Sequence, residues 1–152
     1  MNVKIICIGN LKENYHKEAI AEYSKRLTRY CNFGIIELPE SKIPEKFSQK
    51  DINTALEKEA SLIEKHLDKK ALNIALCIEG KQLSSESFAE NFTKTDINLI
   101  IGSSHGLSEK IKSQCERISF SKMTFPHQLM RVIAAEQVYR AFTIINNGKY
   151  HK

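Results

Sequence analysis

The chain has 152 residues, the size of one domain, and its 41% hydrophobic and 27% charged content is ordinary for a soluble globular protein. Its 23 lysines and arginines outnumber 18 acidic residues, a net charge of +5 that is compatible with a polyanionic partner without requiring one. No apolar stretch approaches the roughly 20 residues that span a bilayer or forms a signal peptide, so we expect one domain over residues 1–152, in the cytoplasm and without membrane contact.

The first half of the chain alternates between short apolar runs and helical patterns. Strands are predicted at Val3–Gly9 and Phe33–Leu38, and apolar residues spaced by three or four predict a helix from about Asn14 to Tyr30 between them. The segment Pro39–Lys50 carries two prolines, three lysines and two serines, which is typical of a loop. Asp51 is predicted to cap the helix that follows.

The second half of the chain repeats this alternation. Strands are predicted at Leu72–Ile78, Ile97–Ile101 and Ile118–Phe120. Helices are predicted after Ser84 or Ser85, from Ser108 to about Arg117, and from about His127 to Ile145. Near-continuous apolar strands that alternate with helices predict an α/β domain, with a mainly parallel sheet and helices on both faces.

Three segments follow strands and are expected at the carboxyl edge of the sheet, where ligands bind in such folds. They are Glu79–Lys81, Gly102–Gly106 and Ser121–His127. The second, GSSHG, matches neither the dinucleotide nor the phosphate fingerprint, and a glycine here is also typical of a plain strand-to-helix turn. His105 alone is more typical of an exposed loop histidine than of a ligand or base.

The four cysteines form no C-x-x-C pair. Cys7, Cys31, Cys77 and Cys115 are therefore predicted to be reduced thiols of a cytosolic protein, rather than parts of a zinc site or disulfide framework. No metal site is predicted.

The last predicted helix is apolar around nearly its whole circumference. A sheet covers only one side of such a helix, so a partner subunit is expected to cover the other. Glu136 and Arg140 are spaced to pair with each other, and Arg131 lies opposite Arg140, so one of the two arginines is expected to point into a cleft or interface. The terminal segment Gly148–Lys152 is predicted to be either a frayed end or an arm that brings His151 to an anionic substrate.

The approach to this helix is expected to be extended. Pro126 suits the first turn of a helix and disfavours helical geometry at Phe125. Ser121–Phe125 would then leave a run of unpaired backbone groups beside the Gly102 loop, and an adenine edge could satisfy them much as another strand would.

The segments IEGK (78–81), IGSSHGLS (101–108) and SFSKMTFPHQLMRVIAAEQVYRAF (119–142), with the terminal YHK (150–152), resemble the RlmH family of the SPOUT superfamily. The resemblance spans essentially the whole chain. It implies a C-terminal trefoil knot, a homodimer and an S-adenosylmethionine-dependent methyltransferase. The methyl acceptor it implies is N3 of a pseudouridine in helix 69 of 23S rRNA, in the assembled ribosome.

The resemblance also implies site residues. The cofactor would contact Leu76, Gly102, and the segment of Phe120, Ser121, Lys122, Met123, Thr124 and Phe125. Near the target nucleotide it implies Arg131, Tyr150 and His151, with the terminal Lys152. The chain departs from the family where Ser103 replaces a second glycine and His105 replaces an Asn or Glu.

N3 of pseudouridine is a weakly acidic imide, so its attack on the methyl group needs a base or cations that stabilise the developing anion. His151 is the expected base, and Arg131 would neutralise the imide, in a pocket built across the dimer. Two alternatives stay open: a SPOUT enzyme that methylates another RNA such as tRNA, and a non-catalytic ribosome-binding factor.

Overall fold

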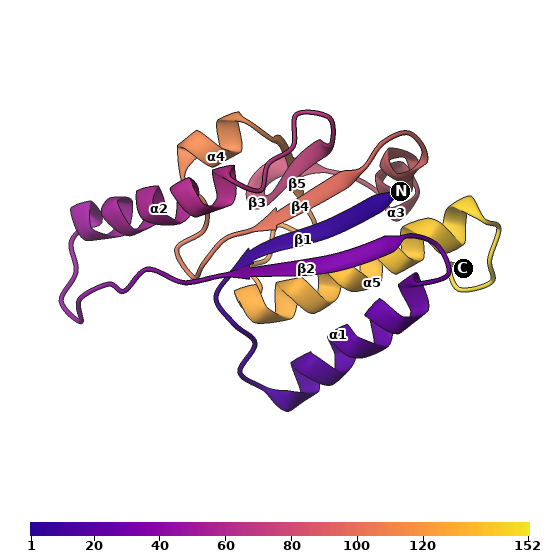
Figure 1. Cartoon of the computed structure of the whole chain (residues 1–152), viewed down its shortest axis with the longest axis horizontal. Helices are drawn as coiled ribbons and strands as arrows, with labels where there is room; N and C mark the ends of the chain where they lie inside the picture. Colours follow the sequence, from indigo (N-terminus) through magenta and orange to yellow (C-terminus); the bar gives the residue numbers. More distant parts are fainter.

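The computed structural model describes residues 1–152 and confirms a parallel α/β fold (Figure 1). Five strands form one sheet in the order β2–β1–β4–β3–β5, and every neighbouring pair is parallel. The strands are β1 (Asn2–Ile8), β2 (Asn32–Leu38), β3 (Leu72–Gln82), β4 (Ile97–Ile101) and β5 (Glu116–Ser119). The helices are α1 (Asn14–Leu27), α2 (Gln49–Glu64), α3 (Ser85–Ala89), η1 (Glu90–Thr93), α4 (Glu109–Ser113) and α5 (His127–Ile145).

Helices cover both faces of the sheet, as predicted (Figure 1). Successive strand residues point to opposite faces, so the apolar runs divide between two cores. In β1, for example, Ile5 belongs to the core under α1, α3 and α5, whereas Ile6 belongs to the smaller core under α2 and α4. Burial on both faces is why these strands are continuously apolar.

Serines cap three of the helices. Ser84 and Ser108 accept hydrogen bonds from the first turns of α3 and α4, as predicted. For α2 the prediction was wrong by three residues: Ser48 is the cap, and Asp51 is the third helical residue, completing a capping box with Ser48. Pro126 likewise lies just before α5, with φ −53° and ψ 137°, rather than inside its first turn.

Two boundaries near the carboxyl edge differ from the prediction. Glu79–Lys81 belongs to β3, which runs on to Gln82, and α4 ends at Ser113, before β5 begins. At Gly80, β3 and β5 approach so closely that a Cβ added to this glycine would lie 2.5 Å from the carbonyl carbon of Ile118. The pairing of β3 with β5 shifts register between Leu76 and Lys81. Gly80 is therefore required for close strand approach, not for a turn.

The C-terminal segment folds back along α5. Asn147 adopts a left-handed conformation with φ 54°, the N–H of Gly148 donates to the carbonyl of Thr143, and the N–H of Asn147 donates to that of Ile144. These two bonds form a Schellman motif, which ends a helix and reverses the chain. The terminus is thereby directed onto α5 instead of into solvent.

All four cysteines are free thiols, as predicted. Cys7 is fully buried, and this burial raises the pKa of its thiol to about 12. None of the helices combines the length and the apolar character needed to cross a membrane.

Candidate cofactor site and tail cluster

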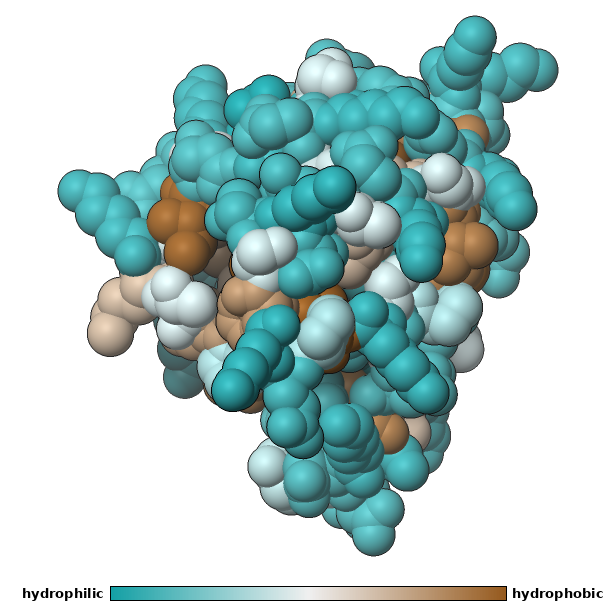
Figure 2. Space-filling model, turned by 90° about the vertical axis from the view of Figure 1, so that its left-hand side faces the viewer, coloured by the Kyte–Doolittle hydropathy of each residue, from teal (hydrophilic) through white to brown (hydrophobic).

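A cavity of about 730 Å³ opens at the carboxyl edge of the sheet, the side of the molecule that faces the viewer in Figure 2. It is bounded by residues 76–79 of β3, the loop after β4 and the segment between β5 and α5; of the three segments predicted at this edge, 102–106 and 121–127 contribute most of their residues and 79–81 contributes only Glu79. The surface on this side is largely hydrophilic, with several hydrophobic groups exposed among the hydrophilic ones (Figure 2). The volume falls in the range of small-molecule and cofactor sites, about 300–1,000 Å³.

Seven of the eight predicted cofactor residues line this cavity. They are Leu76, Gly102, Phe120, Ser121, Met123, Thr124 and Phe125. Lys122 is an exposed residue within the same segment. Cys77, Ile78, His127 and Met130 also line the cavity, and the sequence did not single them out as cofactor contacts.

The Gly102 loop presents main chain to the cavity. A Cβ on Gly102 would overlap the carbonyl group of Gly106 and lie 3.0 Å from the nitrogen of Leu107. Ser103 and Gly106 form an isolated antiparallel bridge, with the N–H of Gly106 donating to the Ser103 carbonyl at 2.9 Å. Only glycine at position 102 permits this close return of the loop.

The segment Ser121–Phe125 leaves its backbone groups largely unpaired, as predicted. Among its N–H groups only that of Met123 has an internal partner, the hydroxyl of Ser121 at 3.0 Å. Backbone donors and acceptors tend to be paired in folded proteins, so this run is available to a ligand. With Leu76 and Phe120 beside it, the segment offers both the apolar surface and the hydrogen-bonding edge that an adenine ring requires.

Glu59 is a buried acid behind the Gly102 loop. It lies on α2, is 2% exposed, and its Oε1 accepts from the N–H of Ser41 at 3.1 Å. Its Oε2 is enclosed near Ser103 without a hydrogen-bond partner. Burial raises the pKa of this carboxyl, and the contacts with Ser41 and Ser103 offset part of the rise. Through its contacts with Ser41 and Ser103, Glu59 links the Pro39–Ser48 segment to the Gly102 loop.

Replacing Glu59 with glutamine is expected to stabilise the protein at pH 7.5. A carboxyl whose pKa is raised on folding contributes stability below its unfolded value, about 4.3, and loses it as the pH rises through the folded value. Glutamine keeps an acceptor for Ser41 without the buried charge. Thermal unfolding should therefore show a higher midpoint for E59Q at pH 7.5, with a gap that narrows towards pH 4. A difference in midpoint between E59Q and the wild type that stays constant from pH 7.5 to pH 4 would contradict the raised pKa of Glu59.

Arg131 ties the start of α5 to the ends of β1 and β2. Its guanidinium contacts a carboxylate oxygen of Glu37 at 2.7 Å and donates to the carbonyl of Gly9 at 2.9 Å. The side chain is 1% exposed and does not line the cavity. Arg131 was one of two arginines expected to reach a cleft or interface; it points instead into the interior of its own chain, against the ends of β1 and β2. Its role at the nucleotide stays a prediction, and in this structure the guanidinium is enclosed by its own chain.

Replacing Arg131 with lysine is expected to lower the free energy of unfolding by about 1–3 kcal/mol, the cost of leaving a buried acceptor without its donor. A single ammonium cannot reproduce the fork that reaches both Glu37 and Gly9. Urea unfolding measures the loss. The same substitution at Arg26, whose pair with Glu22 is exposed, should change stability by less than about 1 kcal/mol. Equal effects at both positions would argue against the bridging role.

Tyr150 and His151 pack on the last turns of α5, in what we call the tail cluster: Tyr150 and His151 with Glu86, Glu136 and Arg140. The Tyr150 hydroxyl donates to Glu136 at 3.0 Å, and its ring lies 4.8 Å from the Arg140 guanidinium. His151 Nδ1 lies 3.2 Å from Arg140, and its Nε2 lies 2.8 Å from Glu86. The predicted pair of Glu136 with Arg140 is confirmed.

These contacts fix the chemical state of the tail. Arginine can only donate, so the contact with Arg140 makes Nδ1 of His151 the accepting nitrogen, while Nε2 faces the carboxylate of Glu86. The hydrogen bond from His151 is the largest cause of a Glu86 pKa of about 2. Burial raises the pKa of Tyr150, which keeps it a phenol. Of the two tail residues, His151 is the one whose side-chain type commonly serves as a general base near neutral pH.

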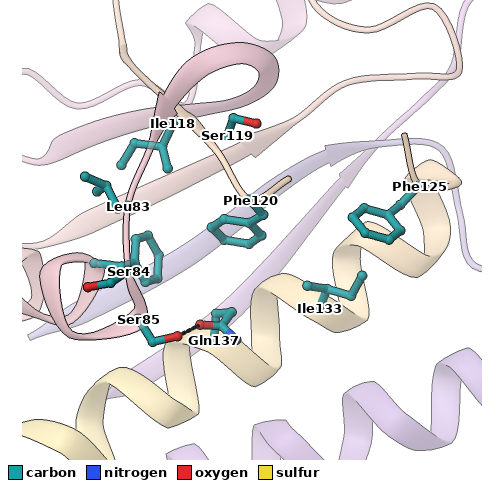
Figure 3. A pocket seen from close by; sticks show the side chains of 10 residues that line it. Leu83, Ser84, Ser85, Ile118, Ser119, Phe120, Phe125, Ile133 and Gln137 are labelled. Atoms are coloured by element: carbon teal, nitrogen blue, oxygen red, sulfur yellow. Dashed lines mark hydrogen bonds between the residues drawn. The ribbon is translucent and has the colours of Figure 1, made fainter. Parts of the chain in front are cut away.

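The tail cluster and the large cavity lie at opposite ends of α5. Met130 lines the cavity and Arg140 holds the tail, ten residues later, which is about 15 Å along a helix. A smaller cavity of about 180 Å³ lies between them (Figure 3). It shares Phe120 and Phe125 with the large cavity, and on its other side Ser85 donates to Gln137 at 3.1 Å. One chain therefore does not bring its tail to its own cofactor cavity.

The sequence did not assign Arg140, Glu136 and Glu86 to a site. The spacing of Glu136 and Arg140 was visible, but nothing in the sequence showed that the terminus folds back onto them. Within the whole chain, no group of three or more His, Cys, Asp or Glu side chains is arranged to hold a metal ion.

Comparison with known proteins agrees with this geometry. Residues 1–151 match a family described as "Predicted SPOUT methyltransferase". The chain is 47% identical to the ribosomal RNA large subunit methyltransferase H of Limosilactobacillus reuteri, with all of both chains covered. It is 50% identical to the protein of that name from Clostridium botulinum strain 657, and 48% identical to that from Streptococcus uberis, again over the whole of both chains.

Proposed function

Because the chain belongs to the SPOUT methyltransferase family, we propose that it is an S-adenosylmethionine-dependent methyltransferase of 23S rRNA that modifies N3 of pseudouridine 1915 in the assembled ribosome. The observation that carries this proposal is the lining of one cavity by seven of the eight residues predicted to bind the cofactor. The full-length identity to three rRNA methyltransferases supports the substrate. A ribosomal substrate would place the protein in the cytoplasm.

The cofactor would be held mainly by main chain. The free backbone groups of Ser121–Phe125 would bind the adenine edge, while Leu76 and Phe120 cover its faces. The Gly102 loop would close around the ribose side. When bound, S-adenosylmethionine supplies an electrophilic methyl group, so no metal is needed. We also propose the trefoil knot of the family, on the strength of the full-length family match.

The complete site would form across a homodimer. The outward side of α5 carries the partly exposed Leu129, Val132 and Ile133 next to the cavity, and Arg140 with the tail near its other end. In a two-fold contact the same surfaces meet in both directions. Antiparallel packing of two α5 helices would bury the apolar half and lay the tail cluster of one subunit over the cofactor cavity of the other.

In that arrangement the tail would serve the acceptor base. The N3–H bond of the pseudouridine breaks as its nitrogen takes the methyl group, and the proton needs an acceptor. His151 would take it on Nδ1, with the substrate proton replacing the present contact of that nitrogen with Arg140, and Arg140 would then stabilise the developing imide anion. Arg131, predicted at the nucleotide, would act in this arrangement by fixing the start of α5 under the cofactor segment.

Ribosomes from cells that lack this enzyme, incubated with the purified protein and labelled cofactor, should gain one N3-methylpseudouridine in 23S rRNA by nucleoside analysis. Label found in tRNA instead would favour a SPOUT enzyme with another substrate. Absence of S-adenosylmethionine binding in calorimetry, with ribosome binding retained, would favour a non-catalytic ribosome-binding factor. Methylation confined to protein-free RNA would contradict the assembled ribosome as substrate.

A further inference from the structure

Exposed apolar side chains gather around the mouth of the cofactor cavity. Ile78 and Met123 line the cavity and are 53% and 73% exposed. Phe47, 52% exposed, lies edge-on to His105, another cavity-lining residue, with ring centroids 5.6 Å apart. A single exposed apolar residue is ordinary, but a group of them around one opening marks a surface that binds something.

Phe47 is presented by a segment that is fastened at both ends. On one side the N–H of Ser41 donates to the buried Glu59, and on the other Ser48 starts the capping box of α2. This segment stretches along the carboxyl edge between β2 and α2 (Figure 1). A residue just before a helix cap often packs on the fourth helical residue, here Ile52, yet half of the Phe47 ring surface is left free.

Lysines flank Phe47 along its segment. Lys42, Lys46 and Lys50 of this segment, and Lys122 of the segment before α5, are exposed and form no ion pair. Glu40 and Glu45 are the exposed acids of the same segment. An aromatic ring among unpaired lysines is the arrangement that binds single-stranded nucleic acid, because the base stacks on the ring and the phosphates meet the cations.

We propose that Phe47 is a stacking platform for an unpaired base next to the methylated nucleotide, with Lys42 and Lys46 on the adjoining phosphates. This inference rests on the proposed RNA substrate. The platform would hold the strand at the mouth of the cavity, so that the target base enters while its neighbour stacks outside. Phe47 would thus set affinity for the ribosome without touching the cofactor.

Three variants test the platform: Phe47→Ala, Phe47→Leu and Phe47→Trp. Stacking of one base on an aromatic ring accounts for about 5- to 150-fold in affinity, so F47A and F47L should raise KM for ribosomes by that factor. F47W should keep it near the wild-type value. The cofactor Kd, from calorimetry, should be unchanged in all three, because Phe47 does not line the cavity. Leucine keeps an apolar side chain before the α2 cap but has no aromatic ring. A wild-type KM for F47L would therefore show that the ring is not needed and would overturn the proposal.

The lysines give a second, independent readout. The double variant K42A/K46A should reduce the slope of log KM against log salt concentration by about 1.4, because each phosphate contact on a single strand contributes roughly 0.7. F47A should leave that slope unchanged. An unchanged slope in the double variant would remove the lysines from the interface.

Photo-crosslinking identifies the partner. Phe47→p-benzoylphenylalanine, irradiated on ribosomes, should crosslink to 23S rRNA close to the methylated nucleotide. A crosslink only to ribosomal protein, or none, would overturn the proposal. These outcomes are distinct from failure of the proposed function, in which the wild-type protein itself would not methylate ribosomes.

Discussion

Replacing Gly102 with alanine is expected to weaken S-adenosylmethionine binding by at least about 100-fold. The added Cβ would overlap the carbonyl of Gly106, which belongs to the backbone of the same loop and cannot rotate away as a side chain could. The loop would have to open by on the order of 1 Å, and displacements of that size in a binding site typically cost about 100-fold. Calorimetric titration with the cofactor measures the change.

Gly34→Ala is the matched control. Gly34 lies in β2, and nothing lies within 4 Å of where its Cβ would be. The same substitution there should leave both cofactor affinity and stability near the wild-type values. If G102A bound the cofactor as tightly as G34A does, the cavity at this edge of the sheet would not be the cofactor site.

Deleting Tyr150–Lys152 is expected to lower single-turnover methylation of ribosomes by about 10²- to 10⁴-fold, the usual contribution of a positioned acid or base. Cofactor binding should be largely retained, because the expected cofactor contacts at Leu76, Gly102 and the segment 120–125 all lie outside the tail. Lys149→Ala, which alters an exposed lysine just outside the tail cluster, should have little effect. Unchanged single-turnover methylation after the deletion would refute the role of His151.

A mixture of the two defective proteins tests whether the site spans the dimer. Neither the tail-deleted protein nor G102A should be active alone. In a mixed dimer the intact cavity of the tail-deleted subunit can receive the intact tail of the G102A subunit. Random subunit exchange should then restore about a quarter of the wild-type sites, because half of the dimers are mixed and each has one complete site. No recovery after verified exchange would mean that each chain uses its own tail.

The periodicity of the sequence was sufficient for the fold class, but not for the strand order. Continuous apolar strands such as β1 and β4 have residues in both cores, and a parallel sheet with both faces covered is the arrangement that buries them all. The extended approach to α5 also followed from Pro126, whose ring restricts the residue before it. The boundaries at Gly80 and Ser48 were wrong, because close strand approach and cap choice depend on neighbours that the local sequence does not contain.

The candidate site could be predicted only in part. The order of strands and glycines along the chain determined which segments meet at the carboxyl edge, and the resemblance to a known family named residues that line the cavity there. Only the tertiary structure decided that Arg131 is enclosed between Gly9 and Glu37, that the Schellman motif after α5 turns Tyr150 and His151 onto Arg140, and that Phe47 meets His105. The physical reason is distance along the chain: 94 residues separate Glu37 from Arg131, and no local pattern records a contact of that span.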